Sequence, residues 1–510
     1  MIEIAQIHTL PANLEENYKK IRNCLKEAQK KNVETLIFPA FSLTGYPIAD
    51  ELKSEGFMKQ CWIYVERLLK YSEGLTVFLD IPFSEKNQLV HRLLCLENRK
   101  IKAFSDHSCQ WNDVGLNFNR YFKTSEQFQA AKSFKFGMAF ASELEQKLEN
   151  SSEFEKWVVL DAWSFDYKTI NSRIQYFCNL AKQHHVEIFL ANAVGGQGSL
   201  ILSGGSMHIG SDGKILKQYP YFSEAFLNSK AVKIPQSEIE WIYKALVCGI
   251  RDYFKDRGLK TAVLGLSGGI DSAVVLPLVA EALGRKNVLG VLLPSQYSTQ
   301  HSIDDAVELA DNLGVEYHII PIEKAFQTMH ETLLPVFGKR PFGLAEENLQ
   351  ARIRGMILMG ISNKLGHVLL NTSNKSELAV GYGTLYGDLC GGLSVLGDLY
   401  KFQVYELANF INKKRKFIPQ NSIDKAPSAE LRPNQKDSDS LPEYDVLDAI
   451  LQLHLDQNLS ANDIIKKGFD QKLVEKTLNL VKYNAYKHQQ TPPQLRISNS
   501  AFGIDRITVF

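Results

Sequence analysis

The chain has 510 residues, more than one hydrophobic core ordinarily holds, because single cores rarely grow past about 250 to 300 residues. Hydrophobic residues make up 45% and charged residues 23%, the proportions of a soluble globular protein, so we expect two domains. With 58 basic and 57 acidic residues, the chain has no overall field to attract nucleic acid or a membrane, and an anionic ligand needs a local site.

Seven cysteines are scattered along the chain and form no CxxC pair or other metal-ligand spacing. The start, MIEIAQIHTL, lacks the basic and long apolar segments of a secretion signal. No stretch reaches the roughly 20 apolar residues of a membrane span. We therefore expect a cytoplasmic protein with reduced thiols and no membrane anchor.

The first half alternates strand-like and helix-like segments. MIEIAQI, ETLIFPAF and LTVFLDIPF have the composition of strands, residues 13–31 have the apolar spacing of a helix, and HRLLCLENRKIKAF has the pattern of a hairpin. A second round follows, with the strand KWVVLDAW, the helix SRIQYFCNLAKQHH, the strand EIFLANAV and a hairpin turning at SDGK. These elements predict a layered α/β domain over residues 1–232.

The second half begins with a long helical segment, IEWIYKALVCGIRDYFKDRG, which stops at glycine before the buried strand KTAVLGLSGG. The strands NVLGVLLPS, EYHIIPI and HVLLNTSN then alternate with helices at 299–313 and 347–364. This βαβα order predicts a doubly wound parallel sheet over residues 236–510. Residues 413–442 are polar and contain prolines, which indicates an ordered loop or a lid.

The stretch AVLGLSGGIDSAVV carries the strongest chemical signal. An apolar strand stops at Ser267 and a helix begins near Asp271 and Ser272, so free backbone N–H groups and the positive end of the helix dipole converge on one concavity. Gly268 and Gly269 let the backbone approach an anion closely. The sequence therefore predicts a phosphate site that follows neither the Walker A nor the GxGxxG pattern.

SGGxDS after a buried strand resembles the pyrophosphate loop of the ATP pyrophosphatases, whose fold is adenine nucleotide α-hydrolase-like. The motifs ENLQARIRGMILMGISNK, LLNTSNKSELAVGYGTLYGD, LYKFQVYELANFIN and KAPSAELRPNQKDSDSLPEYDVLDAI resemble the NAD synthetases of that superfamily, over essentially all of residues 236–510. The resemblance implies an ATP site made of Gly265, Leu266, Ser267, Gly268, Gly269, Ile270, Asp271, Ser272, Thr372, Lys401 and Ser428. It implies that deamido-NAD contacts Asn348, Arg352, Glu377, Lys487 and His488.

The reaction implied by the resemblance transfers AMP to the nicotinate carboxylate of deamido-NAD, after which ammonia displaces AMP to give NAD. A carboxylate is a poor electrophile, so adenylation is needed, and charge developing on the departing pyrophosphate must be neutralised. Asp271 and Glu377 suit Mg²⁺ and Lys401 suits the phosphates. Asp388 is the candidate acceptor for the ammonium proton, with a structural turn carboxylate as the alternative. Lys401, Asp271 and Asp388 are the predicted catalytic residues of an ATP-dependent ligase.

Residues 1–232 resemble the nitrilase-type glutaminase domain that many NAD synthetases carry, through the motifs GYP, RYF, VGGQ and GGS. Such domains use a glutamate, a lysine and a nucleophilic cysteine, and the corresponding positions here are Ala40, His107 and Ala141. Alanine has no lone pair with which to attack an amide carbon. We therefore expect a pseudo-glutaminase domain and an ammonia-dependent enzyme. Cys109 lies two residues from His107 and leaves a relocated cysteine-histidine pair as an alternative.

Further alternatives remain open. The same chemistry on nicotinate mononucleotide would give NMN, and glutamine would serve if a relocated or partner-supplied glutaminase were active. A third possibility, from another functional class, is a non-catalytic regulator or assembly partner. The resemblance also implies a homo-oligomer, since NAD synthetases form dimers or larger assemblies, and no binding to nucleic acid or membranes is expected.

Overall fold

The chain forms two compact units, Met1–Gln236 and Ser237–Phe510. The computed structural model describes residues 1–85, 88–107, 128–130, 134–151, 153–227 and 232–506. No helix in these described segments combines the length and apolarity needed to cross a bilayer. Each unit has its own hydrophobic cores and is described by itself.

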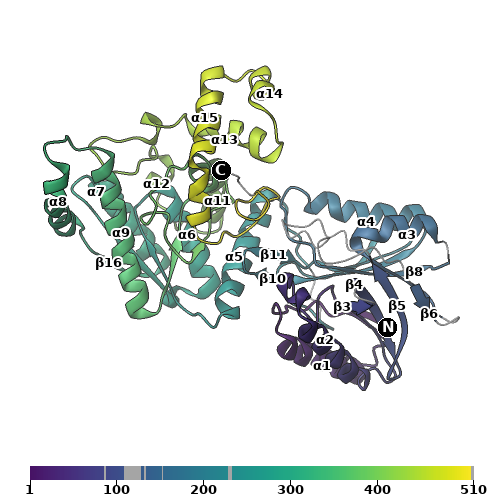
Figure 1. The fold of residues 1–510 in the computed structure, drawn as a ribbon. Coiled ribbons are helices and arrows are strands. Elements are labelled where there is room, and N and C mark those ends of the chain that lie inside the picture. The colour runs from purple at the N-terminus through teal and green to yellow at the C-terminus, as the bar shows by residue number, and fades with distance from the viewer. Residues whose placement is uncertain (86–87, 108–127, 131–133, 152, 228–231, 507–510) are drawn as a thin grey trace. The chain divides into compact units, whose positions relative to one another are not determined.

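The first unit contains two main sheets, and helices cover the outer face of each (Figure 1). One sheet has the strand order β1-β2-β3-β4-β5-β6, the other has the order β13-β12-β9-β8-β7, and β10 pairs with β11 in a hairpin. The strands are β1 (Ile2–Ile4), β2 (Thr35–Ile37), β3 (Thr76–Glu85), β4 (Gln88–Glu97), β5 (Lys100–His107), β6 (Phe128–Ala130), β7 (Phe136–Phe140), β8 (Lys156–Asp161), β9 (Glu187–Asn192), β10 (Val194–Gln197), β11 (Leu200–Ser203), β12 (Met207–Ile209) and β13 (Ile215–Gln218). The helices are α1 (Leu14–Lys30), α2 (Glu55–Leu69), α3 (Leu144–Asn150) and α4 (Ile170–His184), with short 3₁₀ turns at η1 (Ala49–Lys53) and η3 (Ala141–Glu143).

Residues of each buried strand alternate between the helical layer and the space between the sheets. In β3, Val77 and Leu79 pack in the same core as α1 and α2, whereas the intervening Phe78 meets the ring of Phe136 from β7, with centroids 5.3 Å apart. Asp80 occupies the same inter-sheet side as Phe78, two residues further on. The space between the two sheets is therefore bordered by polar as well as aromatic side chains.

The second unit is built on a five-stranded parallel sheet with the order β16-β15-β14-β17-β18. Its strands are β14 (Ala262–Gly265), β15 (Val288–Leu292), β16 (Glu316–Ile319), β17 (Val368–Asn371) and β18 (Leu393–Ser394). Its helices are α5 (Glu238–Asp256), α6 (Ile270–Leu283), α7 (Gln300–Leu313), α8 (Glu323–Phe337), α9 (Leu344–Leu365), α10 (Lys375–Val380), α11 (Lys401–Lys414), α12 (Gln420–Asp424), α13 (Tyr444–Leu451), α14 (Ala461–Lys466) and α15 (Gln471–Asn484). Shorter turns are the 3₁₀ segments η4 (Arg285–Asn287), η5 (Asp437–Asp439) and η7 (Ala485–Gln490) and the π-helix η6 (Gln452–Asp456).

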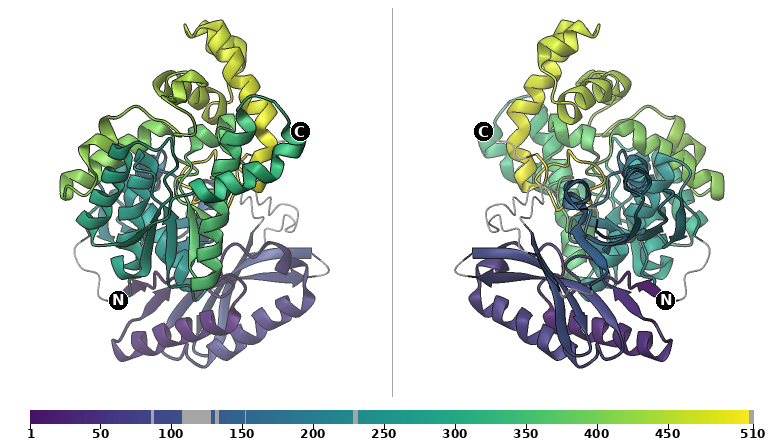
Figure 2. Two further views of the ribbon diagram at one scale, coloured as in Figure 1. Left: turned by 90° about the vertical axis from the view of Figure 1, so that its left-hand side faces the viewer. Right: turned by 90° about the vertical axis from the view of Figure 1, so that its right-hand side faces the viewer.

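Helices cover both faces of the parallel sheet (Figure 2). Helices α8 and α9 share a core with strand residues such as Val263 and Val291, while α5, α6, α7 and α11 pack together on the other face. Because β15 and β17 flank β14 on opposite sides, the strand order reverses at the carboxyl end of β14. Ligands of doubly wound sheets bind at such a switch point, which here is the position of Ser267.

The predicted α/β fold class is confirmed for both units, and most predicted elements are present. The structure differs at α2 and α8, which the sequence analysis did not anticipate, and α9 begins at Leu344 rather than at the expected residue 347. No residue of α8 is fully buried, and Phe326 is a partly buried α8 side chain that packs against the sheet core. The polar segment 413–442 is ordered and contains α12 and η5.

Candidate active site

The predicted phosphate loop lies at the carboxyl end of the central strand β14. The strand ends at Gly265, the chain turns through Ser267 and Gly268, and α6 begins at Ile270. Gly268 has a φ of +74°, and a Cβ atom there would come within 2.1 Å of the Ser302 carbonyl oxygen, so the position requires glycine. The first N–H groups of α6 have no acceptor within the helix, and this favours an anion at the loop.

A cavity of about 540 Å³ opens beside this loop. The carboxyl ends of β15 and β17 and the segment 425–437 also border it. Its lining contains most of the predicted ATP and catalytic residues, namely Gly265, Leu266, Ser267, Gly269, Ile270, Asp271, Ser272, Thr372, Glu377, Asp388, Lys401 and Ser428. Gly268 is held in place by Ser422, whose Oγ donates a hydrogen bond of 3.1 Å to the Gly268 carbonyl oxygen. Residues from distant parts of the sequence thus meet in one cavity.

Lys401 forms the centre of the charged part of the cavity. Its Nζ lies 2.6 Å from Asp271 Oδ2 and 3.1 Å from Glu377 Oε1, and the lysine side chain is only 2% exposed. Burial alone lowers the pKa of Lys401, but the two carboxylates outweigh it and hold the pKa above its usual value. Burial raises the pKa of Glu377 to about 8, against the lowering effect of Lys401. The ammonium therefore stays charged in a site crowded with carboxylates.

Asp437 adds a third carboxylate that the sequence analysis did not single out. The hydroxyl groups of Tyr382 and Tyr444 each donate a hydrogen bond of 3.1 Å to it, and burial raises its pKa. The ring of Tyr444 also lies under the Lys401 ammonium, 5.0 Å from Nζ. The one signal that could have identified Asp437 was its acidic setting, KDSDS, within the polar segment expected to cover the site.

The capping of α10 fixes Glu377 relative to the phosphate loop. Asn374 caps this helix, because its Oδ1 accepts from the Glu377 backbone N–H at 3.0 Å. The same side chain donates from Nδ2 to Asp271 Oδ1 at 2.8 Å. The backbone N–H of Lys401 in turn donates to Ser376 Oγ at 2.9 Å. One short helix therefore links the first residues of α6 and α11.

Asp388 and Arg354 are two further charged residues of the cavity lining. Asp388 accepts the Thr384 backbone N–H at 2.6 Å, and burial raises its pKa. Burial also lowers the pKa of Arg354 to about 10, opposed by Asp388 and by Glu430. Arg354 was not predicted, although the neighbouring Arg352 was. Two residues apart on a helix, these arginines point in different directions.

Arg352, Asn348, Lys487 and His488 come together elsewhere, around residues 378–385. Arg352 Nε donates to the Leu385 carbonyl at 3.3 Å, and Asn348 Oδ1 accepts from Thr384 at 2.8 Å. Lys487 Nζ donates to the carbonyl oxygens at positions 381 and 383, and His488 contacts the carbonyl at 378. The cavity lining of the described chain does not include these four residues.

The segment 425–437 borders the cavity through Ser428 and Glu430. Ser428 Oγ donates to the carbonyl at position 435 and accepts the Glu430 backbone N–H, which tightens the loop. Glu430 Oε1 then accepts from Thr299 at 2.8 Å and from Ser302 at 2.7 Å, beside the phosphate loop. These bonds hold the predicted lid segment against α7.

The three positions predicted to correspond to glutaminase residues lie next to a stack of three rings, either along the chain or across a strand pair. Ala40 follows β2, Ala141 begins η3 directly after β7, and His107 ends β5 opposite His91 of β4. The rings are those of Phe41, His91 and Phe140, whose adjacent centroids lie 4.6 Å and 4.3 Å apart.

Asp80 completes this buried cluster. It pairs with His91 Nε2 and accepts the Phe41 backbone N–H at 2.8 Å. Both Asp80 and His91 are fully buried, and Ala40 and Ala141 are nearly so. Cys109 and the RYF motif lie outside the described residues, so the relocated cysteine-histidine pair stays a prediction.

The doubly wound sheet, the glycine turn at its switch point and the buried lysine between carboxylates fit an ATP-dependent ligase that forms amides. Comparison with protein families matches residues 242–491 to the family described as NAD synthase. A glutamine-dependent NAD(+) synthetase from a Synechocystis species is 37% identical over 540 aligned positions, covering 98% of this chain and 97% of that protein. This chain belongs to the NAD synthetase family.

Solved structures agree with this assignment. The glutamine-dependent NAD⁺ synthetase of Acinetobacter baumannii, solved with adenosine diphosphate, is 32% identical with a TM-score of 0.78, covering 99% of this chain and 97% of that chain. That of Cytophaga hutchinsonii has a TM-score of 0.86 at 20% identity, covering 98% and 95%, and shows the shared fold. The predicted ligase class is confirmed, whereas these relatives favour the glutamine-dependent alternative over the predicted ammonia dependence.

Proposed function

We propose that this NAD synthetase adenylates the nicotinate carboxylate of deamido-NAD with ATP and then amidates it with ammonia, giving NAD, AMP and pyrophosphate. The observation that carries the proposal is the position of Lys401, held between Asp271 and Glu377 next to the loop at Ser267. In this assignment, residues 236–510 are the synthetase domain and residues 1–232 are a pseudo-glutaminase domain.

The first step needs positive charge where pyrophosphate departs. The N–H groups at the start of α6 and the hydroxyl groups of Ser267 and Ser272 suit the β- and γ-phosphates. Lys401 reaches the same cavity and neutralises charge that grows as the bond to the α-phosphorus breaks. Thr372 and Ser428 also line the cavity and complete the proposed ATP site.

The carboxylates of this cavity fit Mg²⁺. Asp271 and Glu377 supply hard oxygen ligands, and with Asp437 they place three carboxyl groups near the single ammonium of Lys401. Within the described residues, no three histidine, cysteine or carboxylate side chains are placed to share one metal ion. Magnesium commonly uses one or two protein carboxylates with phosphate oxygens and water, so Asp271 and Glu377 suffice. The bound ion would supply further neutralisation of the phosphates.

The second step requires ammonia as the neutral nucleophile and an acceptor for its proton. Asp388 lines the cavity and has a raised pKa, which makes it a stronger base than an ordinary carboxylate. Arg354 lies in the same lining and suits the negative charge of a substrate phosphate or carboxylate. Arg352, Asn348, Lys487 and His488 stay proposed deamido-NAD contacts, grouped around residues 378–385.

Ammonia is the proposed nitrogen donor because the first unit lacks the required side chains at its three corresponding positions. Ala40 and Ala141 can act neither as a base nor as a nucleophile. The stack of Phe41, His91 and Phe140 lies directly beside them and is packed at ring-contact distances.

Glutamine dependence is the second candidate, favoured by the names of the relatives. It would require a nucleophile other than residue 141, such as Cys109 or a partner protein. Nicotinate mononucleotide remains the alternative acceptor, since the proposed contacts concern ATP and the nicotinate end of the substrate.

One experiment separates these candidates. Purified enzyme is given ATP with either deamido-NAD or nicotinate mononucleotide, and with either ammonium or ammonia-free glutamine at equal concentration. We expect NAD and pyrophosphate from deamido-NAD with ammonium, and little product with glutamine. Efficient use of glutamine would refute the proposed loss of glutaminase activity. Formation of ADP would refute adenylation. If no pair of substrates gave pyrophosphate, the chain would instead be a non-catalytic regulator or assembly partner.

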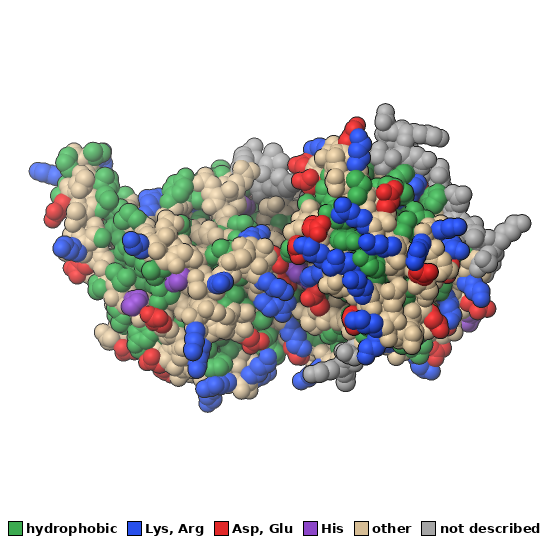
Figure 3. All heavy atoms as spheres, turned by 90° about the horizontal axis from the view of Figure 1, so that it is seen from below, with side chains coloured by type: hydrophobic (Ala, Val, Ile, Leu, Met, Phe, Trp, Pro, Cys, Tyr) green, Lys and Arg blue, Asp and Glu red, His purple; other side chains and the backbone are tan. Residues whose placement is uncertain are grey.

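A homo-oligomer is also proposed, supported by exposed apolar side chains on two helices of the second unit. Hydrophobic side chains gather on the left-hand part of the surface, where α8 and α9 lie (Figure 3). The exposed apolar residues include Val336 on α8 and Leu344, Met356 and Leu365 on α9. Size-exclusion chromatography with light scattering tests this, and a monomer at micromolar concentration would refute it.

A further inference from the structure

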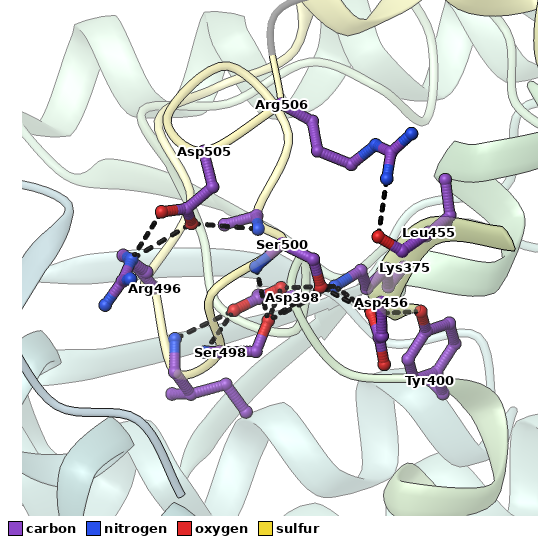
Figure 4. A network of polar contacts seen from close by, with 12 residues as sticks. Lys375, Asp398, Tyr400, Leu455, Asp456, Arg496, Ser498, Ser500, Asp505 and Arg506 are labelled. Atoms are coloured by element: carbon purple, nitrogen blue, oxygen red, sulfur yellow. Dashed lines mark hydrogen bonds and ion pairs between the residues drawn. The ribbon is translucent and has the colours of Figure 1, made fainter. Parts of the chain in front are cut away.

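A buried polar network connects the last described part of the chain to the active-site helices (Figure 4). Its centre is Lys375, the first residue of α10, whose side chain is fully buried. Lys375 Nζ lies 2.8 Å from Asp398 Oδ1, 2.8 Å from Ser500 Oγ and 3.3 Å from Ser498 Oγ. Residues 494–506, which we call the C-terminal clasp, thus supply two of the oxygen atoms around a buried ammonium.

The clasp also forms hydrogen bonds with the segment that leads into α11. Asp398 Oδ2 accepts the backbone N–H groups of Ile497 at 2.8 Å and Ser498 at 2.7 Å. Ser498 Oγ donates to the other carboxylate oxygen at 2.9 Å. Asp398 precedes Lys401 by three residues, so these bonds fix the chain just before the proposed catalytic lysine.

A second arm of the network runs through Asp456. Ser500 Oγ donates to Asp456 Oδ1 at 2.5 Å, and the hydroxyl of Tyr400 donates to the same oxygen at 2.9 Å. The ring of Tyr400 also lies 5.0 Å from Lys375 Nζ. Tyr400 is the residue directly before Lys401, so the second arm reaches the same helix start.

The network touches both segments whose spacing matters for the proposed chemistry. On one side, Lys375 lies between the cap residue Asn374 and Glu377 in α10. On the other side, its backbone N–H donates to the Leu399 carbonyl at 2.7 Å, two residues before Lys401. Lys375 itself is outside the cavity lining, so it acts on the reacting groups only through its neighbours.

We propose that Lys375 is a positioning residue and that the C-terminal clasp holds α10 and α11 in the register that places Lys401 between Asp271 and Glu377. The proposal rests on the roles given above to these three residues. A buried ammonium loses its hydration, and it stays buried only where several fixed oxygen atoms replace that water. Withdrawing the clasp oxygens therefore frees Lys375 to shift, and α10 shifts with it.

Such a shift should affect turnover more than nucleotide binding. Displacing a catalytic group by about 1 Å can cost about 100-fold in rate. The phosphate loop is held by β14 and Gly268, which the clasp does not contact in the bonds described, so ground-state binding of ATP should change little. A purely structural role would instead lower stability without a selective loss of kcat.

The test compares the double variant Ser498→Ala/Ser500→Ala with Ser362→Ala. Ser362 is a buried serine at the end of α9 whose Oγ donates to the His367 carbonyl at 2.7 Å, outside the cavity lining. Pyrophosphate release is measured with ATP, deamido-NAD and ammonium, and thermal midpoints report folding. We expect kcat of the double variant to fall at least about tenfold with KM for ATP within about threefold, and Ser362→Ala to keep its kcat.

The outcomes separate the possible failures. A folded double variant with kcat within about twofold of wild type, or a loss matched by Ser362→Ala, overturns the clasp. If the double variant does not fold, Ser500→Ala alone keeps the bonds of Asp398 and should still lower kcat at least about threefold, and wild-type turnover there overturns the proposal. A wild-type enzyme that releases no pyrophosphate overturns the proposed function itself.

Discussion

Replacing Lys401 with methionine removes one charge from the proposed adenylation site while keeping an apolar stem of similar length. The ammonium lies 2.6 Å from Asp271 and 3.1 Å from Glu377. At an effective dielectric constant of about 20, each contact represents about 5 to 6 kcal/mol of Coulomb energy before desolvation is subtracted. Breaking a buried pair usually leaves a net loss of about 3 to 5 kcal/mol in stability.

The effect on turnover is estimated separately from the effect on stability. Removing one group that stabilises developing negative charge typically lowers kcat by about 100- to 1,000-fold. We expect Lys401→Met to lower kcat by about 100-fold, and Asp271→Ala to lower it by at least about tenfold. Lys401→Arg should retain more activity than Lys401→Met because it keeps the charge.

The assay is pyrophosphate release at saturating ATP, deamido-NAD and ammonium, with circular dichroism and thermal melting to establish folding. Lys217→Met is the matched control, since its ammonium lies 2.7 Å from Glu3 in the first unit. The control should lose little or no turnover. A folded Lys401→Met enzyme within about threefold of the wild-type rate would remove this lysine from the mechanism.

Three further predictions concern the loop, a titrating carboxylate and the first unit. Gly268→Ala should weaken ATP binding at least about tenfold in calorimetry because its Cβ meets backbone at 2.1 Å, whereas Gly258→Ala, with φ of +66° but open space, should not. Burial raises the pKa of Glu377 from 4.5 to about 8, so the folded state binds its proton more tightly and loses stability as pH rises through that interval. Glu377→Gln should therefore flatten the fall in thermal midpoint between about pH 5 and about pH 8, and an unchanged slope would contradict the assignment. Ala141→Cys should release no glutamate from glutamine, because Ala40 still supplies no base and His107 still stands at the lysine position, and measurable glutamate release would contradict this reasoning.

Sequence reasoning succeeded where a function depends on a short stretch of backbone. The order of strands and helices in the second half, together with Ser267, Gly268 and Gly269, was enough to place a glycine turn between a buried strand and a helix. Apolar periodicity and glycine turns depend on a few neighbouring residues, so they can be recognised in the sequence without knowledge of long-range contacts. The same holds for the helix at Leu14–Lys30 and for the hairpins β4–β5 and β12–β13.

Side-chain direction was harder to predict. Arg352 and Arg354 are equivalent in a linear motif, and only the packing of α9 against the sheet decides that Arg354 borders the cavity. The sequence did not distinguish Asp437 from the other acidic residues of the polar segment. Its partners Tyr382 and Tyr444 identify it, and neither is its sequence neighbour.

By itself, the sequence determined the two α/β architectures, the glycine turn at Ser267 and the residue types on which the proposed adenylation depends. Only the tertiary structure decided that Lys401 lies between Asp271 and Glu377, that the His91 ring stacks on those of Phe41 and Phe140, and that Ser500 binds Lys375 at the start of α10. The reason is physical: backbone pattern is set by neighbours along the chain, whereas these contacts join residues far apart in sequence that only packing of the folded layers brings within bonding distance.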